Sequence, residues 1–176
     1  MSGHNKWSKI KHKKAATDAK KSKEFSKLAR LIAVESKKCG GDPNSPGLRT
    51  VVDKARSINM PKDNIERAIA KGKAGDGTDM NEITYELYGP GGVAVLVDAL
   101  TDNNNRTNQE IKHLLSKLGY SLATPGSATW AFTKENHEWV ATTESGLTDE
   151  DLEKLSDLVD QLEEHDDVQS VVTNAA

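Results

Sequence analysis

The sequence contains little cysteine, few aromatic residues and no long apolar run. Its single cysteine, Cys39, cannot form an internal disulfide, which fits a reducing compartment and excludes zinc sites built from several thiolates. No stretch approaches the roughly 18 apolar residues that a membrane span requires. The N-terminus is charged and carries no apolar segment, so a secretory signal peptide is not expected. These absences predict a cytoplasmic protein without membrane partners.

Signatures of catalysis are also missing. The five histidines are scattered, and neither an HExxH motif, a GxSxG motif nor a phosphate-binding Walker loop is present. The segment from Tyr88 to Gly92 lacks the GxGxxG spacing and leads into a strand, so it does not predict a dinucleotide site. We therefore expect a protein that is not an enzyme and that uses neither a metal ion nor a cofactor.

Charge is abundant and unevenly distributed, although the net charge is only -3. Residues 1–40 carry twelve positive and three negative side chains, whereas residues 137–176 carry twelve acids and only Lys154 as a cation. The acidic end would be repelled by phosphate, so it should orient the basic end toward a polyanionic partner.

The segment from Gly3 to Arg30 holds nine lysines besides Arg30, against Asp18 and Glu24 as its only acids. So dense a cationic segment suits a phosphate backbone, and the interleaved Trp7 and His12 could stack on or contact unpaired bases. A solvated, disordered basic tail is the alternative interpretation. We expect a nucleic-acid interface that also includes two arginines of a later helix, and its candidate residues are Lys6, Trp7, Lys9, Lys11, His12, Lys13, Lys14, Lys20, Lys21, Lys23, Lys27, Arg49 and Arg56.

Apolar residues three and four apart predict three amphipathic helices in the first part of the chain, at about 15–38, 48–58 and 61–72. Glycine and proline separate the helices, so they should form a small helical bundle. We expect a basic N-terminal helical domain over residues 1–75, followed by a linker over residues 76–81.

The remaining residues, 82–176, predict an α+β domain of the order β-β-α-β-β-α-β. Its mainly antiparallel sheet should carry both helices on one face. Thr107 and Glu110 have the spacing of a capping box at the start of the first of these helices, and Thr148 and Asp151 should cap the second. We expect the strands at about 82–88, 93–100, 127–133, 137–142 and 168–172.

Two turns of this domain could contact a partner. One follows the first strand, and the other lies between the second strand and a helix N-terminus, a place suited to phosphate. An Asx-rich turn that only caps the helix is the alternative for the second turn. The candidate contact residues are Tyr88, Gly89, Pro90, Asn103, Asn105 and Arg106.

Three long motifs resemble the YebC/PmpR family, whose mitochondrial branch includes the translational activator of cytochrome c oxidase subunit one. They are GHNKWSKIKHKKAATDAKKSKEFSKLAR from Gly3, GGDPNSPGLRTVVDKARSINMPKDNIERAIAKG from Gly40, and YELYGPGGVAVLVDALTDNNNRT from Tyr85. A shorter match, LEEHDDVQSVVTN, follows near the end of the chain. Asn104 stands where the family commonly has arginine, which weakens the cationic character of that turn.

The resemblance implies a third domain inserted in the second, whereas this chain passes directly from Phe132 to Trp139 where the insert is expected. It also implies a nucleic-acid-binding regulator that is not an enzyme. We expect a monomeric, ribosome- or RNA-associated translation factor, because a lysine-rich segment with an aromatic residue suits irregular RNA. DNA-binding transcription regulation is the alternative, and Arg49 and Arg56 keep it open.

Overall fold

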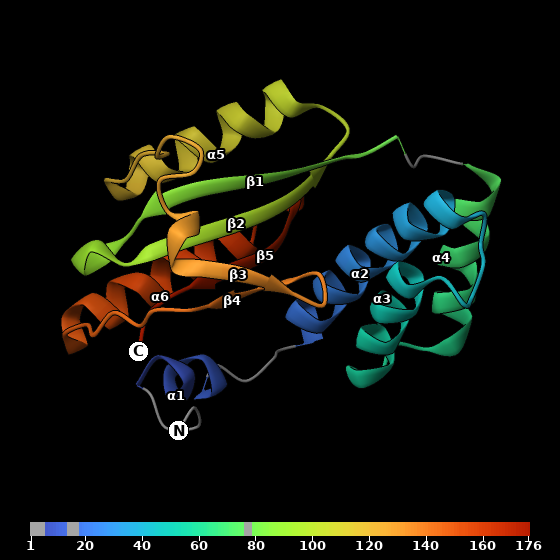
Figure 1. Ribbon diagram of the computed structural model, residues 1–176, viewed down its shortest axis with the longest axis horizontal. Helices are drawn as coiled ribbons and strands as arrows, with labels where there is room; N and C mark the ends of the chain where they lie inside the picture. The colour runs from blue at the N-terminus through green and yellow to red at the C-terminus, as the bar shows by residue number, and fades with distance from the viewer. Residues whose placement is uncertain (1–5, 14–17, 76–78) are drawn as a thin grey trace. The chain divides into compact units, whose positions relative to one another are not determined.

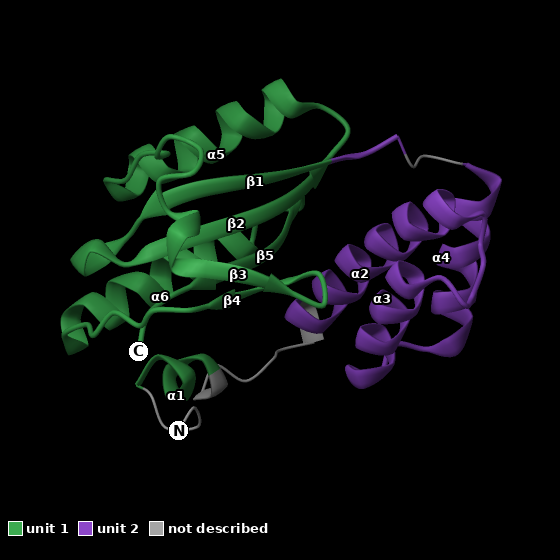
Figure 2. Ribbon diagram, in the orientation of Figure 1, with its two compact units in different colours: residues 1–15, 82–176 green, residues 16–81 purple. Residues whose placement is uncertain are grey.

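The computed structural model describes residues 6–13, 18–75 and 79–176, with side chains up to residue 11 in the first range and from residue 20 in the second. Contacts divide the chain into two compact units (Figures 1 and 2). Residues 16–81 form the helical unit, and residues 1–15 together with 82–176 form the α+β unit. The units are described separately below.

The helical unit is built from α2 (Asp18–Cys39), α3 (Pro46–Ser57) and α4 (Lys62–Ala74). Their apolar stripes meet in one core whose fully buried members include Ile32, Leu48 and Ala55. At the contact between α2 and α4, a Cβ on Gly72 would lie 2.1 Å from the carbonyl oxygen of Ala33. A side chain at residue 72 would therefore force these two helices apart.

The α+β unit contains a three-stranded sheet in the order β1 (Asn81–Tyr88), β2 (Ala94–Thr101) and β5 (Val168–Thr173). The central strand β2 is antiparallel to β5, with Val97 opposite Val171. Both faces of β2 are buried, which explains its continuous apolar sequence.

Two helices, α5 (Asn104–Leu118) and α6 (Asp149–Glu163), cover one face of this sheet (Figure 1). Alternate residues of β2, Val95 and Val97, share a core with Leu115 of α5 and Leu155 of α6. This is the main core of the α+β unit.

The opposite face of β2 is covered by a second, two-stranded sheet. Its strands, β3 (Phe132–Glu135) and β4 (Glu138–Ala141), are antiparallel and joined by a two-residue turn. Both turn residues, Asn136 and His137, have positive φ angles, of 49° and 69°, as a tight hairpin requires. Leu96 of β2 packs against Phe132 in this smaller core.

The short helix α1 (Lys6–Lys13) belongs to the α+β unit, not to the helical unit. Trp7 is 8% exposed and lies in the main core, and Ile10 packs against the same core. The backbone N–H of Trp7 also donates to the carbonyl of Ala176 over 3.2 Å. This grouping differs from the predicted helical domain of residues 1–75, because one buried indole connects α1 to the other end of the chain.

The predicted α+β class and the order of strands and helices are confirmed. Two local predictions are wrong. Residues 129–131 form a 3-10 helix (η2) before β3 rather than part of a strand. The helix α5 begins a turn before the proposed capping box, with Asn103 as the N-cap, whose side chain accepts from the backbone N–H of Arg106. The predicted cap of α6 is confirmed, since Thr148 accepts from the N–H of Asp151.

Candidate nucleic-acid interface

The lysines of α1 lie on the α+β unit. Lys6 forms an ion pair with Asp149 at the start of α6, with 2.9 Å between Nζ and Oδ1. Lys9 and Lys11 are exposed. The candidates His12, Lys13 and Lys14 lie outside the residues whose side chains the structure describes. Within α1, the described cations therefore face solvent or an acid of the same unit.

Trp7 does not occupy the position that base stacking requires. Trp7 is 8% exposed and belongs to the main core in this conformation, whereas base stacking requires an exposed ring. Base stacking by Trp7 therefore stays a prediction, and it would require α1 to leave this core.

The candidate cations of the helical unit lie on α2 and α3. Lys20 and Lys21 are exposed, and Lys23 and Lys27 are partly exposed. These four lysines precede Leu28, the first buried residue of α2, so they all lie in the N-terminal half of this helix.

The two arginines of α3 share a face of that helix, because seven residues correspond to about two turns. Both Arg49 and Arg56 are exposed, and Arg56 lies 3.7 Å from Asp53 between them. The apolar side of α3, which includes Leu48 and Val52, faces the core of the helical unit. These two guanidinium groups thus point away from the core and remain accessible to an anion.

The turn after β1 is a folded structural element. Pro90 is buried, and the N–H of Gly89 donates to the carbonyl of Val93 over 2.8 Å. The Tyr88 hydroxyl donates to the Ser127 carbonyl and accepts from the indole N–H of Trp130 over 3.0 Å. Tyr88 remains 39% exposed, so of the three candidate contacts in this turn it is the one with an accessible side chain.

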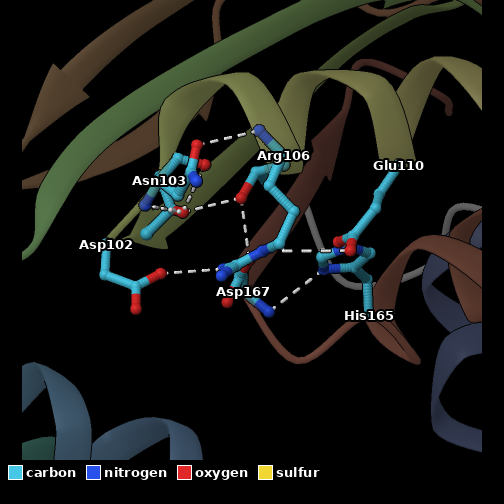
Figure 3. A network of polar contacts seen from close by, with 8 residues as sticks. Asp102, Asn103, Arg106, Glu110, His165 and Asp167 are labelled. Carbon is cyan, nitrogen blue, oxygen red and sulfur yellow. Dashed lines mark hydrogen bonds and ion pairs between the residues drawn. The ribbon is translucent and has the colours of Figure 1, made fainter.

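At the other candidate turn, polar groups converge at the N-terminus of α5 (Figure 3). The Arg106 guanidinium binds Oδ2 of Asp167 at 3.0 Å and Oδ1 of Asp102 at 2.9 Å, and its Nε lies 3.8 Å from Glu110. The hydrogen bonds to Asp167 and Asp102 raise the pKa of Arg106. Three carboxylates therefore surround this cation, which makes it a weak attractor for a further anion.

Asp167 connects this turn to the segment before β5. Its carboxylate accepts from the Thr107 hydroxyl over 2.7 Å, and Thr107 also bonds the Thr101 hydroxyl over 2.7 Å. The neighbouring Tyr85 is buried, and burial together with the charge of Asp167 raises the pKa of its hydroxyl. Among the candidate contacts of this turn, Asn103 acts as a helix cap and Arg106 joins the network, while Asn105 is exposed.

In the described part of the chain, one group of side chains is close enough to consider as a metal site. Atoms of Glu110, His165 and Asp167 lie within 4.8 Å of one another. His165 Nε2 is 2.7 Å from a Glu110 oxygen, and its Nδ1 accepts from the backbone N–H of Asp167 over 3.1 Å. Since Arg106 already supplies the compensating positive charge, we assign this group to the structural network.

Sequence reasoning missed the role of Glu86. It lies in β1 between Tyr85 and Leu87, both of which belong to the main core, so period-two alternation alone would place it on the solvent side, yet it is 6% exposed. Its carboxylate accepts from the backbone N–H groups of Gly126, Ala128 and Thr129, the last two over 3.0 and 2.9 Å. Burial raises the pKa of Glu86, but these hydrogen bonds outweigh burial, so the pKa lies below its ordinary value of 4.5. The loop it holds carries Trp130, which is 61% exposed.

The fold and the charge distribution show a two-unit protein, in which a basic helical unit and an acidic α+β unit belong to one chain. The helical unit, residues 16–81, carries fourteen cations and nine acids, whereas the α+β unit, residues 1–15 and 82–176, carries ten cations and eighteen acids. No helix in the described ranges is both long and apolar enough to cross a membrane.

The chain belongs to the TACO1/YebC family. The family's N-terminal domain, described as "TACO1/YebC protein N-terminal domain", matches residues 5–75. The "TACO1/YebC second and third domain" matches residues 80–137 and 133–175. The two matched segments overlap at residues 133–137, at the β3–β4 turn, where the resemblance implies the insertion point of a third domain that this chain was expected to lack.

Relatives of known sequence agree with this assignment. A protein of Thermosipho africanus named "Probable transcriptional regulatory protein" is 58% identical over 137 residues, covering 77% of this chain and 54% of the relative. A protein of the same name from Petrotoga mobilis is 54% identical over 137 residues, covering 77% of this chain and 55% of that one. The chain thus spans about half the length of these relatives.

A solved structure has the same fold. The crystal structure of a conserved hypothetical protein, Aq1575 from Aquifex aeolicus, superimposes with a TM-score of 0.79 at 33% sequence identity. The match covers 95% of each chain.

Proposed function

We propose that this protein is a non-catalytic regulator that binds nucleic acid through the cations of its helical unit. The observation that carries the proposal is the separation of charge between the units. Exposed Lys20, Lys21, Arg49 and Arg56 lie on the basic unit, whereas the α+β unit has a large excess of acids that would repel a phosphate backbone.

Within this proposal, RNA is the preferred partner and a translating ribosome the preferred setting, which would place the protein in the cytoplasm. Lysines dominate the basic surface, and they act as mobile point charges that suit irregular, partly single-stranded RNA. The two arginines of α3 lie about two turns apart and could bridge successive phosphates of such a strand.

Transcription regulation through duplex DNA is the second candidate, and the names of the relatives favour it. It requires a sequence-specific footprint that survives competitor DNA at physiological salt. Binding driven by lysine and phosphate alone would be nonspecific and would weaken steeply as salt increases.

The test measures fluorescence anisotropy of a labelled single-stranded RNA and of a duplex DNA of the same sequence. In the test variant, Lys20, Lys21, Lys23 and Lys27 are changed to alanine. We expect its RNA affinity to fall, with the salt slope decreasing by about one for each lysine that contacts a phosphate. Ribosome co-sedimentation of the same variant should fall in parallel.

A double variant with Lys112→Ala and Lys117→Ala is the matched control, because these lysines are exposed on α5 of the acidic unit. It should bind RNA as the wild type does. The test variant removes four charges and the control two. An equal loss of affinity per charge removed would therefore mean that only net charge matters, and it would contradict the proposed surface. Tighter, sequence-specific binding to the duplex would favour transcription regulation over RNA binding.

A further inference from the structure

The helix α1 is cationic, yet it is docked on the most acidic part of the molecule. The docking has an apolar component, since Trp7 and Ile10 pack in or against the main core of the α+β unit. It also has a polar component, in which the N–H of Trp7 donates to the carbonyl of Ala176 and Lys6 pairs with Asp149. The sequence also predicts that the lysines of this segment bind nucleic acid. The same helix can therefore bind either the α+β unit or a nucleic acid.

The surroundings of the docked helix are strongly anionic. The first turn of α6 consists of Asp149, Glu150 and Asp151, and Lys6 is paired with the first of them. Lys11 lines a cavity of about 400 Å³, and Glu144 and Thr173 also line it. Two carboxylates of the α+β unit, those of Asp149 and Glu144, thus lie near lysines of α1, where they can compete with the phosphates of a nucleic acid.

We infer that the acidic α+β unit holds α1 as an intramolecular latch that competes with nucleic acid for the lysines of this helix. The inference rests on the proposed function and adds the lysines of α1 to the contacts that the helical unit makes with nucleic acid. Two states follow, one with Trp7 docked and one with α1 released onto the polyanion. The free energy of docking lowers the apparent affinity for nucleic acid.

The contacts that hold the latch are few enough to be exchanged. The Lys6–Asp149 pair is well exposed, with side-chain exposures of 66% and 84%, so it is screened by salt and replaceable by a phosphate. An eight-residue helix is too short to be stable alone in water, so α1 depends on its partner for its shape. Trp7 therefore provides the main anchor.

The test compares variants of the whole 176-residue chain in binding to a short, labelled single-stranded RNA of mixed sequence. Trp7→Ala removes the anchor without changing the charge of α1, and we expect roughly three- to tenfold tighter binding. Asp149→Asn removes only the ion pair, and we expect roughly twofold tighter binding. Asp157→Asn, an equal charge change at an exposed position of the same helix, controls for the loss of one acid and should give the smaller effect.

A direct readout is the fluorine NMR resonance of Trp7 in protein labelled with 5-fluorotryptophan and assigned with a Trp7→Phe variant. We expect this resonance to move to a solvent-exposed position as RNA saturates the protein. Thermal unfolding of each variant checks that the α+β unit is folded. If Trp7→Ala does not fold, the comparison of Asp149→Asn with Asp157→Asn still tests the latch.

The outcomes separate the latch from the proposed function. RNA binding that is unchanged in Asp149→Asn and Trp7→Ala, with a stationary Trp7 resonance, overturns the latch and leaves the proposed function intact. Weaker binding by Trp7→Ala also overturns it, because that sign indicates base stacking. If wild type and variants all fail to bind RNA, both the proposed function and the latch are wrong.

Discussion

The helical unit and the α+β unit differ in the extent of their cores as well as in charge. The helical unit packs one apolar stripe from each of three helices into a single core. The α+β unit buries both faces of β2, with α5 and α6 on one side and the β3–β4 hairpin on the other. Since apolar burial is the main stabilising contribution to folding, the acidic unit should be the more stable scaffold and the basic unit the more adaptable one.

The largest expected effect comes from core truncation in the smaller unit. Ile32 of α2 is completely buried, so Ile32→Ala should cost about 3 kcal/mol through lost burial and the cavity left behind. Calorimetry should show a lower transition temperature for the helical unit alone.

Leu155→Ala is the matched change in α6, because Leu155 is equally buried in the other core. It should lower the transition of the α+β unit and leave that of the helical unit in place. A single transition that moves equally in both variants would show that the two units unfold together.

An intermediate effect tests the buried carboxylate of the α+β unit. Glu86→Gln replaces a charged acceptor of three backbone hydrogen bonds with a neutral amide, and we expect a loss of about 2 kcal/mol. Urea unfolding at neutral pH measures the loss. Glu135→Gln, at an exposed position of β3, is the control and should change stability little.

The same residue gives the α+β unit a pH dependence. Because the folded state holds the pKa of Glu86 below 4.5, its contribution is present above that pH and is lost as the pH falls through the lower, folded value. The Glu86→Gln variant should lack this part of the acid-induced loss. An identical pH profile in variant and wild type would contradict the assignment.

The smallest expected effect distinguishes a helix cap from a contact residue. Asn103→Ala removes the side chain that accepts from the N–H of Arg106, and we expect a loss of about 1 kcal/mol. Asn105→Ala changes an exposed position inside the same helix and should be close to neutral for stability. If Asn105→Ala instead weakens RNA binding while Asn103→Ala does not, this turn contacts the partner after all.

Local periodicity predicted the helices from α2 onward and most strands, because the apolar residues of each buried stripe lie within a few residues of one another in the sequence. It did not predict α1. The errors occurred at residues whose burial and hydrogen bonds depend on segments far away in the sequence. Thr107 and Asn103 are both good capping residues, but Asp167 from beyond α6 binds the Thr107 hydroxyl and fixes it inside the protein. Glu86 has the spacing of an exposed residue, and only the loop carrying Ala128 and Thr129 makes it a buried acceptor.

The candidate site was predicted in part. The exposed cations of α2 and α3 could be identified from the sequence, because charged residues alternate there with an apolar stripe. The docking of α1 could not, since its partner is at the other end of the chain. Trp7 and Ile10, three residues apart among lysines, were the available signal, because two apolar side chains on one side of a short helix need a surface to cover them.

The β3–β4 turn has a consequence for how chains of this family vary in length. Its two residues protrude at the end of a hairpin whose flanking positions, Glu135 and Glu138, are directly paired. A domain whose two ends lie close together could be inserted at this turn without changing the register between β3 and β4. A whole domain could thus be gained or lost at this turn during evolution, while the fold of the α+β unit is kept.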